Sequence, residues 1–269
     1  MRFTDVIYEH QFINGGVIMA GHSKWANIKH KKQKEDKRKA KLFSKFSKKI
    51  AVAAREGGGD LEMNSDLRLA IQKAKDNNMP NENIERAIKR GTGELEGVNY
   101  ESFVYEGYGP GGVALYMEIM SDNRNRTASE IRHILSKNGG NLGESGCVSW
   151  MFDKKGQITL NLDENEINEE QLLLTAIEVG AEDVVVEDDI ATIYTTVNDF
   201  EKVRLNLEKE GLNIDSSDLA MVPRNEVDLD QQNSRKILNL LENLEDHDDI
   251  QEVYANFNIP DEIMEEIDD

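Results

Sequence analysis

The spacing of apolar residues divides the chain into a helical part and a mixed part, and the change falls near Gly97. Before this residue, apolar side chains recur at intervals of three and four positions, which is the period of one helix face. The pattern predicts three helices, over residues 37–55, 65–76 and 81–90. Asn64 or Ser65 is the expected N-cap of the second helix. Three short helices with short connections indicate a small bundle.

After Gly97 the apolar residues alternate in short runs, which is typical of strands, with amphipathic helices between them. The pattern predicts strands over residues 103–108, 113–120 and 147–152, with a helix over 126–137. A β-α-β-β-α-β succession over 158–222 has the element order of a ferredoxin-like unit. The last segment predicts a strand at 227–229, a helix at 234–244 and a strand at 253–257.

Together these elements predict an α+β protein, with an N-terminal three-helix bundle and two ferredoxin-like α/β sandwich domains, one inserted in the other. Residues 98–152 lack a helix and a strand that residues 225–260 could supply, which indicates a discontinuous domain. Residues 1–18 show no periodicity and are expected to be a non-native or disordered extension, with Met19 as the native start. The predicted divisions are an extension (1–18), a basic helical domain (19–97), a discontinuous α/β domain (98–152 and 225–260), an inserted domain (153–224) and an acidic tail (261–269).

Charge is distributed unevenly along the chain, whose formal net charge is −20 at pH 7. Residues 19–93 contain 19 Lys/Arg against 9 Asp/Glu, whereas residues 94–269 contain 12 against 41. Such asymmetry is typical of a nucleic-acid-binding part joined to an acidic body. The hypothesis requires that the cationic part keep positive surface open to solvent.

The segment from Gly21 to Lys32 combines cations with Trp25, which could stack on an unpaired base or lodge in a groove while the cations displace counterions from phosphates. A solvated basic tail, with Trp25 packed on the bundle, is the alternative. Arg124 and Arg126 lie just before and at the start of a predicted helix, where phosphate binding and a simple cap with solvated arginines are equally compatible with the pattern. The candidate nucleic-acid-binding residues are His22, Lys24, Trp25, Lys29, His30, Lys31, Lys32, Lys34, Lys37, Arg38, Lys41, Lys45, Lys48, Lys49, Arg124 and Arg126.

Other chemistry has weaker support in the sequence. The glycine-rich stretches 107–112 and 139–146 lack the spacing of nucleotide-binding loops, so turns explain them better. The five histidines lack paired metal-ligand spacing, and Cys147 falls in an apolar run typical of a packed thiol. We therefore expect no catalytic residues, no metal and no cofactor. The single cysteine, together with the lack of a signal peptide or membrane span, indicates a cytoplasmic protein.

Five segments carry distinctive strings of residues, and they are 19–32, 79–91, 105–112, 123–127 and 143–152. These strings closely resemble the YebC/TACO1 family, and the resemblance spans nearly all of residues 19–260. The resemblance implies three domains around a cleft, no enzymatic activity, and either DNA-binding transcriptional regulation or ribosome-associated activation of translation.

The expected function is a non-enzymatic, nucleic-acid-binding regulator of gene expression, with DNA indicated by the resemblance and ribosomal RNA as the alternative. The sequence offers no clear helix-turn-helix reading helix, which favours RNA on physical grounds. Basic proteins are the expected partners of the acidic domains, and no membrane partner is expected. An enzyme with a site in the cleft and a pure interaction scaffold are weaker hypotheses.

Overall fold

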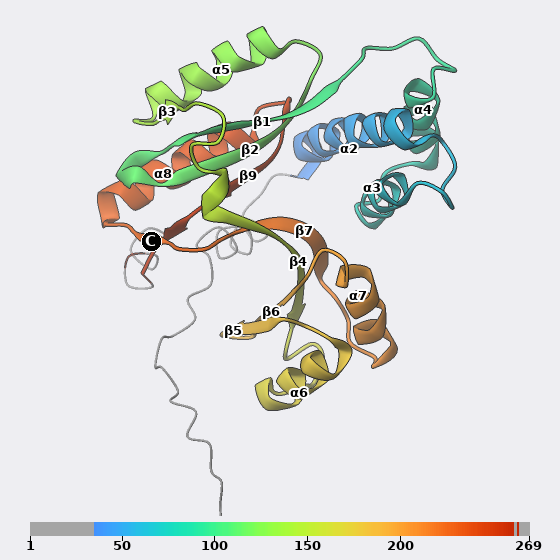
Figure 1. Ribbon diagram of the computed structural model, residues 1–269, viewed down its shortest axis with the longest axis vertical. Coiled ribbons are helices and arrows are strands. Elements are labelled where there is room, and N and C mark those ends of the chain that lie inside the picture. The colour runs from blue at the N-terminus through green and yellow to red at the C-terminus, as the bar shows by residue number, and fades with distance from the viewer. Residues whose placement is uncertain (1–34, 261–262, 264–269) are drawn as a thin grey trace, which may run out of the picture.

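The computed structural model describes residues 35–260 and 263, with side chains from Lys39 onward. Its elements form a helical unit and two units built on antiparallel sheets, which confirms the predicted α+β class (Figure 1). In the described part of the chain, the helical unit consists of α2 (Glu35–Gly57), α3 (Ser65–Asp76) and α4 (Asn81–Gly91). The predicted cap of α3 is also confirmed, since Asn64 Oδ1 accepts a hydrogen bond from Leu67 N at 3.0 Å.

The helical unit has a small core of its own. Each helix contributes buried residues to a single apolar cluster, which includes Ile50, Leu67 and Ile84. Gly91 ends α4 close against α2, and a Cβ at this position would meet the backbone of Ala51 and the methyl group of Ala54. The close crossing therefore depends on glycine.

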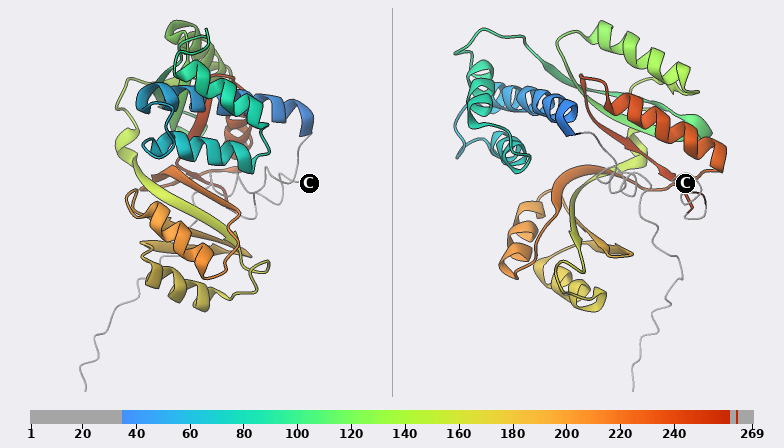
Figure 2. Two further views of the ribbon diagram at one scale, coloured as in Figure 1. Left: turned by 90° about the vertical axis from the view of Figure 1, so that its right-hand side faces the viewer. Right: turned by 180° about the vertical axis from the view of Figure 1, so that it is seen from behind.

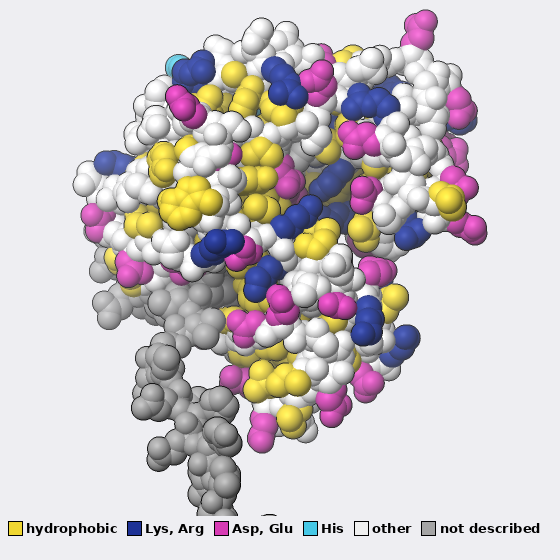
Figure 3. Space-filling model, in the orientation of Figure 1, with side chains coloured by type: hydrophobic (Ala, Val, Ile, Leu, Met, Phe, Trp, Pro, Cys, Tyr) yellow, Lys and Arg dark blue, Asp and Glu magenta, His cyan; other side chains and the backbone are white. Residues whose placement is uncertain are grey.

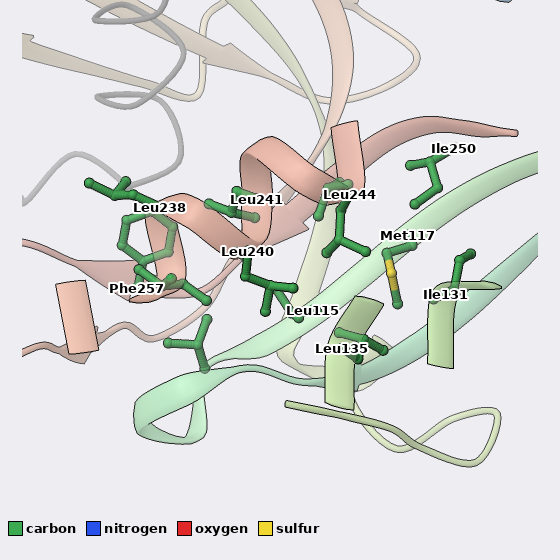
Figure 4. Close-up of a cluster of buried hydrophobic side chains, with 14 of the residues drawn as sticks. Leu115, Met117, Ile131, Leu135, Leu238, Leu240, Leu241, Leu244, Ile250 and Phe257 are labelled. Carbon is green, nitrogen blue, oxygen red and sulfur yellow. The ribbon is translucent and has the colours of Figure 1, made fainter. Parts of the chain in front are cut away.

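The central unit is a four-stranded sheet covered by two helices. Its elements are β1 (Glu101–Tyr108), β2 (Ala114–Ser121), α5 (Arg124–Lys137), β3 (Asn141–Leu142), α8 (Gln231–Glu245) and β9 (Ile250–Ala255). The strand order is β3-β1-β2-β9, so a segment more than a hundred residues later in the chain completes the sheet. Leu115 and Met117 of β2 pack against Ile131 of α5 and Leu241 of α8, which places both helices on the same face (Figure 4).

The inserted unit has the predicted β-α-β-β-α-β order. Its elements are β4 (Phe152–Asn161), α6 (Glu169–Val179), β5 (Asp183–Glu187), β6 (Ile190–Thr195), α7 (Phe200–Lys209) and β7 (Ser216–Pro223). The antiparallel sheet has the order β5-β6-β4-β7, and both helices pack on one face around buried Leu160, Leu172 and Val203. This is the arrangement of a ferredoxin-like fold.

The predicted strand over residues 147–152 is wrong. Residues 147 and 148 belong to a loop, a short 3-10 turn follows as η2 (Ser149–Met151), and β4 begins only at Phe152. The buried Glu106 carboxylate holds the loop by accepting hydrogen bonds from the backbone N–H groups of Gly146, Val148 and Ser149 at 2.7–2.8 Å. Because these amides point at a side chain, they are not available to a strand ladder.

Shorter elements connect the units. The turn between β1 and β2 is η1 (Pro110–Gly112), and β8 (Val227–Asp228) pairs in parallel with β10 (Phe257–Asn258). The helical and inserted units both flank the central unit (Figures 1 and 2). Treating the three units as domains with the limits expected from the sequence remains our proposal. Within the described residues, every helix falls short of the length or apolar character that crossing a bilayer requires.

Gly91→Ala should destabilise the helical unit by about 2 kcal/mol, because the added methyl group would force α4 away from α2. Urea denaturation of the full chain, followed by circular dichroism, measures this change. Gly97→Ala is the matched control, since its Cβ would make only ordinary van der Waals contact with Arg90. Equal stability of the two variants would contradict the argument.

Candidate nucleic-acid interface

Lysines of α2 bind the end of α8, and so join the helical unit to the central unit. Lys41 Nζ donates a hydrogen bond to the carbonyl of Asp246 at 3.0 Å and lies 3.2 Å from its carboxylate. Lys45 Nζ donates to the carbonyl of Glu245 at 3.0 Å. Burial lowers the pKa of Lys45, and nearby Glu252 opposes that shift. Since the C-terminus of a helix carries partial negative charge, these contacts complement the dipole of α8.

Lys48 makes the most buried of these contacts. Its Nζ donates to the carbonyl of Asp248 at 2.8 Å and to Asp249 Oδ1 at 2.7 Å, and the side chains of Lys48 and Asp249 are 9% and 6% exposed. The ammonium group also lies 5.2 Å from the centre of the Tyr100 ring. An ion pair this buried is costly to break, because the remaining charge is left without water or a partner.

Asp249 is the centre of this junction. Its second oxygen, Oδ2, accepts hydrogen bonds from Ser121 at 2.9 Å, Arg126 at 2.7 Å and Thr127 at 2.8 Å. Burial alone would raise the pKa of Asp249, but these hydrogen bonds and the one from Lys48 hold it well below its ordinary value. One carboxylate therefore connects α2, the end of β2, the start of α5 and the turn before β9.

Both arginines that the sequence indicated as a phosphate site have carboxylate partners. Arg124 Nε lies 2.7 Å from Glu101 Oε2, and its guanidinium stacks 4.2 Å from the centre of the Phe103 ring. Arg126 lies 2.8 Å from Asp122 and 2.7 Å from Asp249. In this arrangement both arginines are paired with carboxylates at the start of α5, and a phosphate would have to compete with these carboxylates.

An open pocket of about 920 Å³ lies beside the junction. One group of potential metal ligands within the described residues borders it, formed by Glu130, His247 and Asp249. His247 Nδ1 accepts a hydrogen bond from Asp249 N at 3.1 Å, so its Nε2 carries the proton and lies 2.9 Å from Glu130 Oε2. Both ring nitrogens are thus occupied, and Asp249 is already bound by two cations. The donor set does not fit a metal ion.

The other candidate residues fall into three groups. Lys49 is half-buried and lines a pocket of about 190 Å³ between α2 and β9. Lys37 and Arg38 belong to α2, but their side chains are outside the described part of the structure. The remaining candidates also lie outside the described residues, and they are His22, Lys24, Trp25, Lys29, His30, Lys31, Lys32 and Lys34.

The three units meet at a mixed-charge cluster on the face of the central sheet opposite its helices. Glu118 of β2 and Glu252 of β9 are direct cross-strand partners. Burial raises the pKa of Glu118, and Lys49 opposes the shift. Lys73 of α3 forms an ion pair with Asp218 of β7, whose pKa burial also raises. Figure 3 shows Lys and Arg side chains gathered in the hollow between the units.

The sequence argument missed a second cationic row, on α4. Arg86, Lys89 and Arg90 are exposed, and their spacing of three and four residues places them on one side of the helix. Among the described residues, none of these side chains forms an ion pair. The three-residue and four-residue spacing of these cations is visible in the sequence, although the density of cations is higher before residue 50.

A basic helical unit attached to two acidic α/β units defines the class of this protein, and comparison with known families identifies it. Residues 23–94 match the model of the TACO1/YebC protein N-terminal domain, and residues 100–257 match that of the TACO1/YebC second and third domain. The chain belongs to the YebC/TACO1 family, as the sequence resemblance indicated.

Curated relatives share a name as well as the sequence. A protein of Halothermothrix orenii is 72% identical over 93% of this chain and 99% of its own length. A protein of Natranaerobius thermophilus is 59% identical over 92% of this chain and 99% of its own length. Both are named probable transcriptional regulatory protein. Among solved structures, the crystal structure of a conserved hypothetical protein from Aquifex aeolicus matches this chain with a TM-score of 0.80. The two sequences are 51% identical, and the match covers 90% of this chain and 99% of the other. The family membership supports a regulatory role.

Asp249→Asn should destabilise the protein by about 3 kcal/mol at neutral pH, because Lys48 and Arg126 would lose the charge that they share. A carboxyl whose folded-state pKa is depressed contributes stability above its unfolded pKa of about 3.9 and loses that contribution as pH falls. The difference between the two proteins should therefore be constant above about pH 5 and shrink below about pH 4. Urea denaturation over this pH range measures it.

Asp248→Asn is the matched control, because Asp248 is exposed and contributes its carbonyl to the junction. Its stability should stay within about 0.5 kcal/mol of the parent protein. A similar loss in both variants, or a loss in Asp249→Asn that persists unchanged at acidic pH, would refute the role assigned to the Asp249 charge.

Proposed function

We propose that this chain is a non-enzymatic regulator of gene expression that binds nucleic acid through its helical unit and the basic segment before it. The uneven distribution of charge supports this proposal most directly, since cations are concentrated before residue 93 and carboxylates after it. An acidic body repels phosphates, so it confines a polyanion to the cationic unit.

The exposed row on α4 supports the same assignment. Lys41, Lys45 and Lys48 bind the central unit, so one face of α2 is already occupied. Arg86, Lys89 and Arg90 face solvent on another helix of the same unit. We infer that α4 and the segment before α2 make the phosphate contacts, while the buried lysines of α2 set the orientation of the helical unit.

Two targets fit this geometry. The relatives' name, probable transcriptional regulatory protein, points to DNA. The docking of α2 favours RNA, because a helix held by neighbouring elements on two sides is poorly placed to enter a major groove as a reading helix. Ribosomal RNA, bound through phosphates and unpaired bases, is accordingly the second candidate target.

Replacing four lysines of the basic segment with glutamine should flatten the salt dependence of binding by about three to four units of log-log slope, at roughly 0.7–0.9 per phosphate contact. The variant is Lys29→Gln, Lys31→Gln, Lys32→Gln and Lys34→Gln. Titrations with labelled duplex DNA and with a labelled structured RNA, at several salt concentrations, measure the slope.

The control removes the same amount of charge from exposed lysines of the acidic units. It carries Lys137→Gln, Lys202→Gln, Lys209→Gln and Lys236→Gln. This control should leave the slope unchanged. If the two quadruple variants behave alike, the basic segment is not the contact site.

A triple variant of α4, Arg86→Gln with Lys89→Gln and Arg90→Gln, should lower the slope by about two units. These residues are exposed, so the fold should survive the change. The same titrations measure the effect, with Arg132→Gln, Lys137→Gln and Lys236→Gln as the control. A slope that stays at the parent value would exclude the α4 row.

The choice between DNA and RNA can be tested in cells. Crosslinking followed by sequencing of both bound DNA and bound RNA should enrich promoters if the target is DNA, and ribosomal RNA if the chain acts in translation. Enrichment of neither over a sample without crosslinking would contradict nucleic-acid binding itself.

A further inference from the structure

The helix α6 is apolar on two sides, although only one side faces the core. Leu172 and Ala176 are buried against the sheet of the inserted unit. On the outside, Leu173, Leu174 and Ile177 are 42%, 59% and 61% exposed. Ile177 lies four residues after Leu173 and three after Leu174, so the three side chains form one patch. We call it the α6 patch.

An apolar outer face is unusual on a helix of a two-layer sandwich. Such helices ordinarily expose polar residues, whereas a helix that is apolar all round is buried. A cluster of large exposed apolar side chains with a polar border is typical of an interaction site. The α6 patch therefore has the character of a surface that another molecule covers.

The border of the α6 patch is acidic. Exposed Glu170 lies one turn before Leu174, and exposed Glu178 follows Ile177 directly. The whole segment 153–224 contains 18 Asp/Glu against 6 Lys/Arg. Three of those cations, Lys155, Arg204 and Arg224, are already paired with carboxylates of the same unit. Figure 3 shows apolar side chains bordered by acidic ones on this unit.

We propose that the α6 patch is a docking site for a basic amphipathic segment of a partner protein. Apolar side chains of such a segment would cover Leu173, Leu174 and Ile177, while its Lys or Arg residues would meet Glu170 and Glu178. A second copy of this chain would bring two acidic borders together, and nucleic acid would meet carboxylates. Charge complementarity thus selects a cationic protein segment.

The test uses the full chain and a fluorescent helical peptide of about 14 residues, with Leu on one face and Lys on the other. Fluorescence anisotropy should detect binding of this peptide, and a peptide with Glu in place of Lys should bind at least about tenfold more weakly. Leu174→Ser with Ile177→Ser should weaken binding of the Lys peptide about tenfold. Glu170→Lys with Glu178→Lys, which keeps the apolar residues, should weaken it by a similar factor.

The matched control is Leu95→Ser with Val98→Ser, which removes exposed apolar side chains of the connection between α4 and β1. It should bind the Lys peptide as the parent does. Equal binding of the Lys and Glu peptides, equal loss in the control, or unchanged binding in both α6 variants would overturn the proposal. A dimer in sedimentation that the Leu174→Ser and Ile177→Ser changes dissolve would identify a second copy as the occupant, and would also overturn it.

This inference is independent of nucleic-acid binding. The α6 variants should keep the parent's affinity for a labelled structured RNA and a labelled DNA duplex, because none of the changed residues lies in the helical unit. A loss of peptide binding with intact nucleic-acid binding supports the docking site alone, whereas the lysine variants of the basic segment should show the converse.

Discussion

The contact between the helical unit and the central unit is centred on one buried carboxylate. Asp249 accepts hydrogen bonds from Lys48 of α2 and from Ser121, Arg126 and Thr127 of the central unit. Each of these groups loses its water when it is buried. The contact is therefore favourable only when all of the partners are present to replace that water. This makes the junction nearly all-or-none: the helical unit is held in one orientation, because a partial contact would leave a charge buried without its partner.

The same junction divides the basic residues into two sets with different roles. Lysines on the side of α2 that faces α8 are bound to carbonyl and carboxylate groups of the acidic turn, so their charge is largely neutralised within the molecule. Cations on α4 stay exposed on the same helical unit. The net charge of a segment therefore does not tell how much positive surface it exposes. Some of its cations are paired with groups of the acidic units, and these pairs hold the segment in place. Among the described residues, α4 exposes Arg86, Lys89 and Arg90 to solvent, whereas the α2 lysines that face α8 are bound within the molecule.

The sequence predicted regular elements well because each has a local signal: the three-residue and four-residue spacing of the helical unit, the Asn64 cap, and the β-α-β-β-α-β order of the inserted unit. It failed where a distant side chain decides the backbone. The loop before Phe152 looks like a strand by its apolar residues, but Glu106, about forty residues earlier, takes its amides. The pairing of α2 lysines with residues two hundred positions later has no local signal either. Candidate sites were accordingly recognised as cationic, while their partners could be found only in the folded structure.

The α6 patch and the junction at Asp249 follow from the same physical rule, that a group removed from its preferred surroundings needs a partner. Asp249 is charged and buried, and its partners come from within the chain. Leu174 and Ile177 are apolar and exposed, and the described residues do not cover them. The helix α6 lies on the side of the inserted unit away from the central unit (Figures 1 and 2), so no movement within the junction would bury it. Folding supplies the partners of Asp249. The α6 patch stays exposed, and its acidic border favours a partner that carries positive charge.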